Sequence, residues 1–163
     1  MIFKKVLSSL VFSGFLSMSV IPSACAADPV VTGPASWDVS QEKEDDNFKW
    51  DFKNKAGTEI IVEGDKALSA EELKDLSRAY LITKEAYKTA DDDAQTECTD
   101  IVSSGSILEG KCEYKSEEGE TFVYFLVTTG KEYIFRTSMT GSKEDQAASE
   151  KAWAEFKNGL KVQ

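Results

Sequence analysis

The chain has 163 residues, enough for one domain core, and carries 29 acidic against 19 basic residues with no histidine, a net charge of −10. This charge repels nucleic-acid phosphates and anionic lipids, so it argues against nucleic-acid binding and favours a basic protein partner. The lack of histidine removes the usual Ser-His and Cys-His nucleophile pairs and a common metal ligand.

Residues 1–26 are predicted to be a secretory signal peptide. Lys4 and Lys5 precede an apolar stretch, and the small residues of an Ala-Cys-Ala triplet follow it. We predict cleavage after Ala26, with Ala27 as the alternative. The apolar stretch is shorter than the roughly 20 residues that span a bilayer, so no membrane span is expected. The mature protein would be periplasmic or secreted, with 17 basic residues left after loss of the two lysines.

A lipid anchor on Cys25 is the alternative to a free N-terminus. Lipidation needs an aliphatic residue three positions before the cysteine, and Pro22 stands at that position. The sequence therefore argues against a lipid-anchored product.

The mature chain is predicted to hold a flexible N-terminal arm, residues 27–35, followed by a single α+β domain, residues 36–163. Phe48, Trp50 and Phe52 alternate with polar residues, as in a strand with one buried face. Turn residues follow at 54–57, and apolar alternation resumes to residue 62, which predicts a hairpin. The charged segment 42–47 is expected to be a loop.

Residues 68–93 change to helical spacing, with apolar residues recurring every three or four positions. Ser69 and Glu72 form the sequence pattern of a capping box, and Leu68 is expected to pack on Leu73 as a hydrophobic staple. Three aspartates, residues 91–93, would disfavour the negative end of the helix dipole, so the helix is expected to end before them.

The chain from residue 94 to Met139 predicts an antiparallel meander of four strands, with turns at residues 104–105, 118–119 and 129–130. Residues 122–127 are apolar on both alternation faces, so this strand should be covered on both sides. The following strand turns Arg136 and Ser138 to one face, as expected nearer an edge. A C-terminal helix after a Ser142 cap carries an apolar stripe. The expected fold is thus an antiparallel sheet of about six strands with two helices.

Cys98 and Cys112 are predicted to form a disulfide, because they are the cysteines left in an oxidising compartment after signal removal. A hairpin centred on Gly105 places them opposite each other, although a shift of one residue would separate them. A metal or redox role is disfavoured, because the pair lacks C-x-x-C spacing.

The order of elements, together with residues 130–163, resembles the PsbP-like superfamily and its periplasmic DcrB-like members. In these proteins a final hydrophobic strand leads through a polar turn into an amphipathic helix and a short aliphatic tail. The resemblance implies an α/β/α sandwich and a non-catalytic accessory role in the cell envelope. It supplies no motif whose residues transfer to this chain.

No catalytic, cofactor-binding or metal-binding residues are predicted, and we expect the protein not to be an enzyme. Phosphate-binding glycine motifs are absent. Asp91, Asp93 and Glu97 begin like a calcium loop, but the pattern lacks the required glycine at Thr96 and the acid at Val102.

Ser104, Gly105 and Ser106 are a candidate partner-binding loop. The segment is similar to the Ser-Gly loop that periplasmic lysozyme inhibitors insert into the enzyme cleft, although bulky residues follow it here. An acidic exported protein would be steered electrostatically toward a basic enzyme. The alternative function is therefore an inhibitor or immunity protein against a basic enzyme such as a lysozyme or a toxin.

Overall fold

The computed structural model describes residues 28–91, 93–101 and 106–163. The predicted signal peptide lies outside these residues with Cys25, Ala26 and Ala27, and so do Ser104 and Gly105. The helical elements are η1 (Glu72–Lys74), α1 (Leu76–Lys88), η2 (Lys143–Asp145) and α2 (Gln146–Gly159). The strands are β1 (Val31–Thr32), β2 (Asp38–Glu44), β3 (Asn47–Lys53), β4 (Glu59–Lys66), β5 (Gln95–Ile101), β6 (Ile107–Ser116), β7 (Gly119–Thr129), β8 (Tyr133–Ser142) and β9 (Lys161–Val162).

A seven-stranded sheet forms the centre of the molecule, in the order β2-β3-β4-β8-β7-β6-β5, with every neighbouring pair antiparallel. This confirms the α+β class with an antiparallel sheet, a helix after the first hairpin and a C-terminal helix. The expected number of about six strands is one too few. The missed strand is β2, whose side chains are all exposed, so it shows no alternation of buried and exposed residues.

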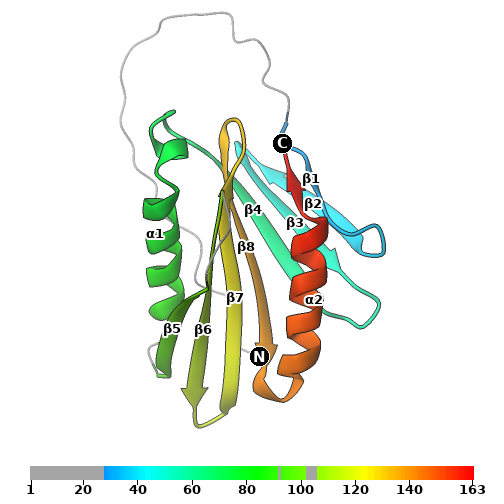
Figure 1. Ribbon diagram of the computed structural model, residues 1–163, viewed down its shortest axis with the longest axis vertical. Helices are drawn as coiled ribbons and strands as arrows, with labels where there is room; N and C mark the ends of the chain where they lie inside the picture. The colour runs from blue at the N-terminus through cyan, green and yellow to red at the C-terminus, as the bar shows by residue number, and fades with distance from the viewer. Residues whose placement is uncertain (1–27, 92, 102–105) are drawn as a thin grey trace, which may run out of the picture.

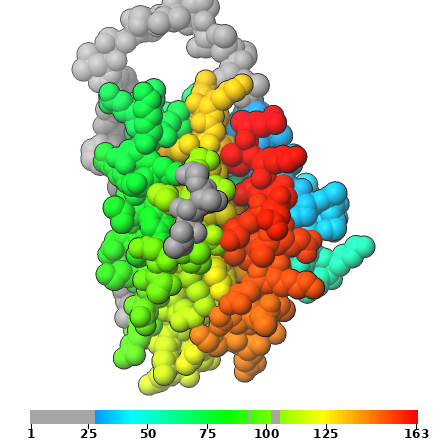
Figure 2. Space-filling model, viewed as in Figure 1, coloured from blue at the N-terminus to red at the C-terminus, as the bar shows by residue number. Residues whose placement is uncertain are grey.

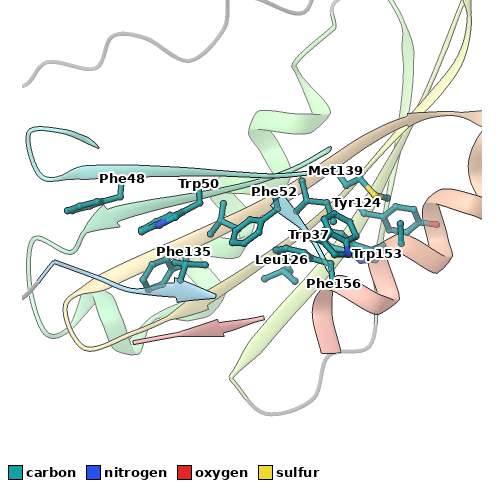
Figure 3. Packing of buried hydrophobic residues seen from close by; sticks show 14 of the residues in the cluster. Trp37, Phe48, Trp50, Phe52, Tyr124, Leu126, Phe135, Met139, Trp153 and Phe156 are labelled. Atoms are coloured by element: carbon teal, nitrogen blue, oxygen red, sulfur yellow. The ribbon is translucent and has the colours of Figure 1, made fainter. Parts of the chain in front are cut away.

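The predicted two-sided burial of β7 is confirmed, because residues 122–128 are all buried. One side of the sheet packs against α1 through Val123, Phe125 and Val127. The other side packs against α2, and its core includes the aromatic layer of Figure 3, with Trp153 and Phe156 beneath the strands. The two helices therefore lie on opposite faces of the sheet (Figure 1).

Strand β8 lies at the centre of the sheet rather than near an edge, which corrects the expectation from its sequence. It pairs with β4 on one side and with β7 on the other. Its polar residue Arg136 is accommodated there because α1 does not extend over β4, and the guanidinium contacts Thr83 of α1 and Asp65 of β4.

The predicted hairpin is present as β3 and β4. Its turn is held by the side chain of Asn54, which accepts hydrogen bonds from the backbone amides of Ala56 and Thr58 at 3.0 and 2.9 Å. Gly57 has φ of 86°, a conformation that favours glycine. The loop expected at residues 42–47 is only a tight turn around Asp45, because its flanking residues belong to β2 and β3.

The start of the first helix differs from the prediction. Ser69 accepts a bond from the Glu72 amide and Glu72 reaches back to the amide of Leu68, but these bonds cap only the short η1 turn. Leu68 is 94% exposed, so it forms no hydrophobic staple. The α-helix begins after Asp75, whose carboxylate caps the amide of Arg78. It ends before residues 91–93, as expected.

Helix α2 is anchored to the sheet by a buried carboxylate. Glu109 of β6 is 7% exposed and accepts hydrogen bonds from Trp153 Nε1 at 2.6 Å and from Lys157 Nζ at 2.7 and 2.8 Å. The predicted Ser142 cap is wrong, because Ser142 precedes η2 and its hydroxyl donates to the Asp145 carboxylate.

Residues 31–32 of the expected N-terminal arm form a strand. β1 pairs with β9 in a two-stranded sheet, which sets Val31 opposite Val162. Val31 is buried in the aromatic core, and Trp37 packs at 5.4 Å from Phe156 of α2. The arm therefore helps to cover the face of the sheet on which α2 lies.

The predicted disulfide is present, and it links the directly opposed residues Cys98 and Cys112 of β5 and β6. The predicted hairpin register is therefore correct. The bond ties the edge strand β5 to the sheet beneath α1.

Replacing both Cys98 and Cys112 with alanine should lower the free energy of unfolding by about 3 kcal/mol, because the unfolded chain loses a short covalent loop. Urea unfolding of the oxidised protein and the double variant would measure the difference. Reduction of the parent protein should give a similar loss. Equal stability of all three forms would contradict a formed disulfide.

Replacing Glu109 with alanine should destabilise the protein by about 3 kcal/mol, because the ammonium of Lys157 and the indole N–H of Trp153 lose their buried acceptor. Glu113→Ala is the matched control on the same strand. Its carboxylate pairs with Lys111 and Lys143 at a more exposed site, so its loss should cost less than about 1 kcal/mol. Equal effects in urea unfolding would refute the anchoring role of Glu109.

Candidate functional site

One half of one sheet face is not covered by either of the α-helices that the structure describes. Helix α1 packs on β5, β6 and β7, so β2, β3 and β4 extend beyond it on the same face. Figure 2 shows α1 in green and α2 in orange to red on either side of the strands, with β2 and β3 in blue to cyan beyond α2. We call the uncovered side the open face, and its side chains are Asp38, Ser40, Glu42, Glu44, Lys49, Asp51, Lys53, Glu59, Ile61, Glu63, Asp65 and Arg136.

Strand alternation places these residues on one side. The aromatic residues Phe48, Trp50 and Phe52 of β3 are buried on the opposite face, so Lys49 and Asp51 between them point the other way. Directly opposed residues on neighbouring strands share a face, which extends the assignment to β2 and β4. The open face is thus the polar reverse of the aromatic core in Figure 3.

The open face carries a strong excess of negative charge, with seven acidic side chains against three basic ones. Only two of the acids form ion pairs within the described residues: Asp51 lies 3.2 Å from Lys49 Nζ, and Asp65 pairs with Arg136. The acids that form no ion pair in this part of the chain are Asp38, Glu42, Glu44, Glu59 and Glu63.

Part of this charge is organised as a ladder across the sheet. Glu42, Lys49, Glu63 and Arg136 lie opposite one another on β2, β3, β4 and β8, so acid and base alternate along the row. Burial beside α1 lowers the pKa of the Arg136 guanidinium, whereas the nearby Glu63 carboxylate raises it. Of the five acids without an ion pair, Glu42 and Glu63 lie in this ladder, and Asp38, Glu44 and Glu59 lie in the rows on either side of it.

A second surface lies on the opposite face, over β5, β6 and β7 beyond the start of α2. It is an open depression of about 460 Å³ whose lining includes Glu97, Glu113, Lys115, Glu120 and Lys143. Its charges largely neutralise each other: Glu113 pairs with Lys143 at 2.8 Å, and Glu120 with Lys115 at 3.7 Å. Hydrogen bonds from Lys111 and Lys143 lower the pKa of Glu113. With three acidic and two basic side chains, the lining of this depression has a much smaller charge excess than the open face.

Of the predicted binding loop, residues 104–106, the structure describes Ser106. This residue is exposed, and its carbonyl accepts a hydrogen bond from Thr128 at 3.0 Å. It immediately precedes β6, next to edge strand β5, whereas the open face ends at edge strand β2. Ser106 and the open face are therefore not parts of one site.

Tyr80, Lys84 and Asp100 form a cluster of residue types that occur at proton-transfer sites, but the pKa values of Tyr80 and Asp100 are shifted away from neutral pH. The hydroxyl of Tyr80 donates to Asp100 Oδ1 at 2.6 Å, and Lys84 contacts the same oxygen at 2.6 Å. Burial and the hydrogen bond to Asp100 raise the pKa of Tyr80, so its phenol stays protonated at neutral pH. Bonds from Lys84 and Tyr80 lower the pKa of Asp100, which makes it a weak base. The cluster attaches α1 to β5.

In the part of the chain that the structure describes, no group of three or more acidic, cysteine or histidine side chains is arranged to hold a metal ion. In the segment that resembles a calcium loop, the carboxylate of Asp91 accepts a hydrogen bond from the backbone amide of Asp93 in a local turn. Neither described helix has the length and apolar character needed to cross a bilayer.

Sequence reasoning missed the open face as a site, although part of the signal was visible. The alternation around Trp50 already places Lys49 and Asp51 away from the core. The sequence does not show that β2 adds a further acidic strand, nor that α1 covers only the other half of the sheet.

Neutralising Glu42, Glu44 and Glu59 together as glutamines should leave stability unchanged or raise it by up to about 0.5 kcal/mol per site, because it relieves like-charge repulsion. The control is the triple change of Glu117, Glu118 and Glu144 to glutamine, at exposed positions outside the open face. Thermal unfolding at low and high salt would compare them. A loss of more than about 2 kcal/mol confined to the first variant would mean that these acids serve folding instead of binding.

Neither a protein-family model nor a curated protein matches this chain.

Proposed function

We propose that this protein is an exported, non-catalytic accessory protein of the bacterial cell envelope that binds a basic protein partner through the open face. The observation that carries the proposal is the acidic excess on an uncovered half-sheet. Five carboxylates there form no ion pair within the described residues, and they lie on a continuous antiparallel sheet. Fixed charge of one sign on a rigid surface steers and orients a partner of opposite sign.

Export is supported by the signal-like residues 1–26 and by the disulfide between Cys98 and Cys112, which persists in oxidising compartments. The PsbP-like or DcrB-like assignment is supported by the element order and by the two helices on opposite faces of one antiparallel sheet. Neither the element order nor the placement of the two helices depends on catalytic residues. An accessory role is consistent with the protonated Tyr80 and the absence of histidine.

A second candidate function is that of an inhibitor or immunity protein against a basic enzyme such as a lysozyme or a toxin. It is favoured by the same charge, because acidic inhibitors associate rapidly with basic enzymes. It differs in the contact that blocks activity, which would come from the predicted binding loop, residues 104–106, and not from the open face. The accessory function therefore requires the open face, whereas the inhibitor function also requires residues 104–106.

The decisive experiment is capture of the partner with the mature protein, residues 27–163, and two charge-reversed variants. Glu42→Lys, Glu44→Lys and Glu59→Lys together should abolish capture of a basic partner from the native host. Glu117→Lys, Glu118→Lys and Glu144→Lys change the net charge equally and should retain it. Binding by the parent protein should weaken from about 50 to 150 mM salt as exposed charges are screened.

An accessory role predicts that the captured partner keeps its activity, whereas an inhibitor would abolish it on titration. Ser104→Trp with Gly105→Trp should impair binding only in the inhibitor case. Intact mass of the bait exported by its host should correspond to a chain starting at Ala27. Equal capture by both charge variants, or capture only of acidic proteins, would overturn the role of the open face.

A further inference from the structure

We infer that the outer edge of β2 accepts an extended basic segment of the partner as an added strand of the sheet. The inference deepens the proposed function, on which it rests for the existence of a basic partner. It concerns how the partner binds, which the charge of the open face does not specify.

Strand β2 is a regular and accessible sheet edge. It pairs with β3 over seven consecutive residues without a bulge, from Asp38 opposite Lys53 to Glu44 opposite Asn47. All its side chains are exposed, and it is the terminal strand of the sheet. In an antiparallel pair every second residue directs its N–H and C=O away from the neighbour. Among the described residues no backbone group pairs with this outer row.

The opposite edge, β5, is less accessible. The disulfide from Cys98 holds it to β6, and α1 lies against it, with Tyr80 and Lys84 both bonded to Asp100. At its end Ile101 packs against the aromatic core. Neither α1 nor α2 packs along β2 in the described part of the chain, so an incoming strand meets fewer obstacles there.

The charges of β2 determine which kind of strand can pair with its outer edge. Asp38, Ser40, Glu42 and Glu44 point to the open face, and Val39, Gln41 and Lys43 point to the other. Residues on one face oppose residues on the same face of an added strand. Every antiparallel register that pairs five or more β2 residues with a second copy therefore sets acid against acid. This pattern disfavours self-association and favours a strand with basic residues at alternate positions.

The register specifies the segment further. In an antiparallel strand of seven residues, the first, third and seventh positions face Glu44, Glu42 and Asp38 and should be lysine or arginine. The sixth faces Val39, which is 56% exposed, and should be apolar. The second faces Lys43, whose ammonium is already bonded to Asp28 at 2.7 Å, so a neutral residue suffices there. Main-chain bonds would supply affinity, and these alternate side chains specificity.

A synthetic peptide, acetyl-Lys-Thr-Lys-Thr-Thr-Val-Lys-amide, tests the inference with the whole mature protein. Two further peptides carry the same side chains and charge, but are N-methylated at the even or at the odd positions. Because alternate amides of a strand point to opposite sides, only one set of methyl groups blocks hydrogen bonds to β2. Calorimetry at low salt should show at least a tenfold loss of affinity for one methylated peptide and less than threefold for the other.

A charge exchange checks the site on the protein. Glu42→Lys with Glu44→Lys should weaken the parent peptide at least tenfold, and a peptide with glutamate at its first and third positions should restore binding. If both methylated peptides bind as well as the parent, contact is purely through side-chain charge, and strand addition is wrong. Absence of binding by the parent peptide overturns it as well. Capture of the protein partner by the open face would survive either result, so failure of this inference is distinct from failure of the proposed function.

Discussion

Strand β7 has no polar face between Phe122 and Thr128, and this two-sided burial determines how the other elements are arranged. A strand of this kind is stable only if apolar layers cover both sides of the sheet. Helix α1 supplies one layer around Phe125 and α2 supplies the other around Tyr124. The buried Glu109 holds α2 against the sheet, and Tyr80 and Lys84 hold α1 through Asp100 of β5. The disulfide acts within the sheet, where it joins β5 to β6.

The open face follows from the width of the sheet. A helix with its side chains is about 10 Å across and strands are about 4.8 Å apart, so one helix covers two or three strands. On the α2 face, Trp37 and the β1–β9 pair extend the cover to β3, where Phe52 is 2% exposed. On the α1 face nothing comparable is present among the described residues, and β3 and β4 present charged side chains instead.

Local chemistry was predictable from sequence, and long-range pairing was not. The turn at Asn54, the opposition of Cys98 and Cys112 and the two-sided burial of β7 depend on neighbouring residues and are confirmed. The position of β8 depends on β4, which lies far away in the chain, so its polar residue Arg136 suggested an edge. The Leu68 staple failed because a short η1 turn intervenes and the helix starts at Asp75 instead. For the candidate site, the outward residues of β3 were predictable, but their exposure depends on the placement of α1.

The pairing of β4 with β8 also has a kinetic consequence. It sets Ile61 opposite Ser138, so the whole of α1 and the β5-β6-β7 meander lies in the loop that this contact closes. Closing a loop of that length costs more chain entropy than forming the hairpins inside it. Until β8 pairs with β4, Trp50 of the β3–β4 hairpin lacks its contact with Phe135. The folding barrier should therefore be set by the meeting of two preformed halves, with an aggregation-prone aromatic surface on the first of them.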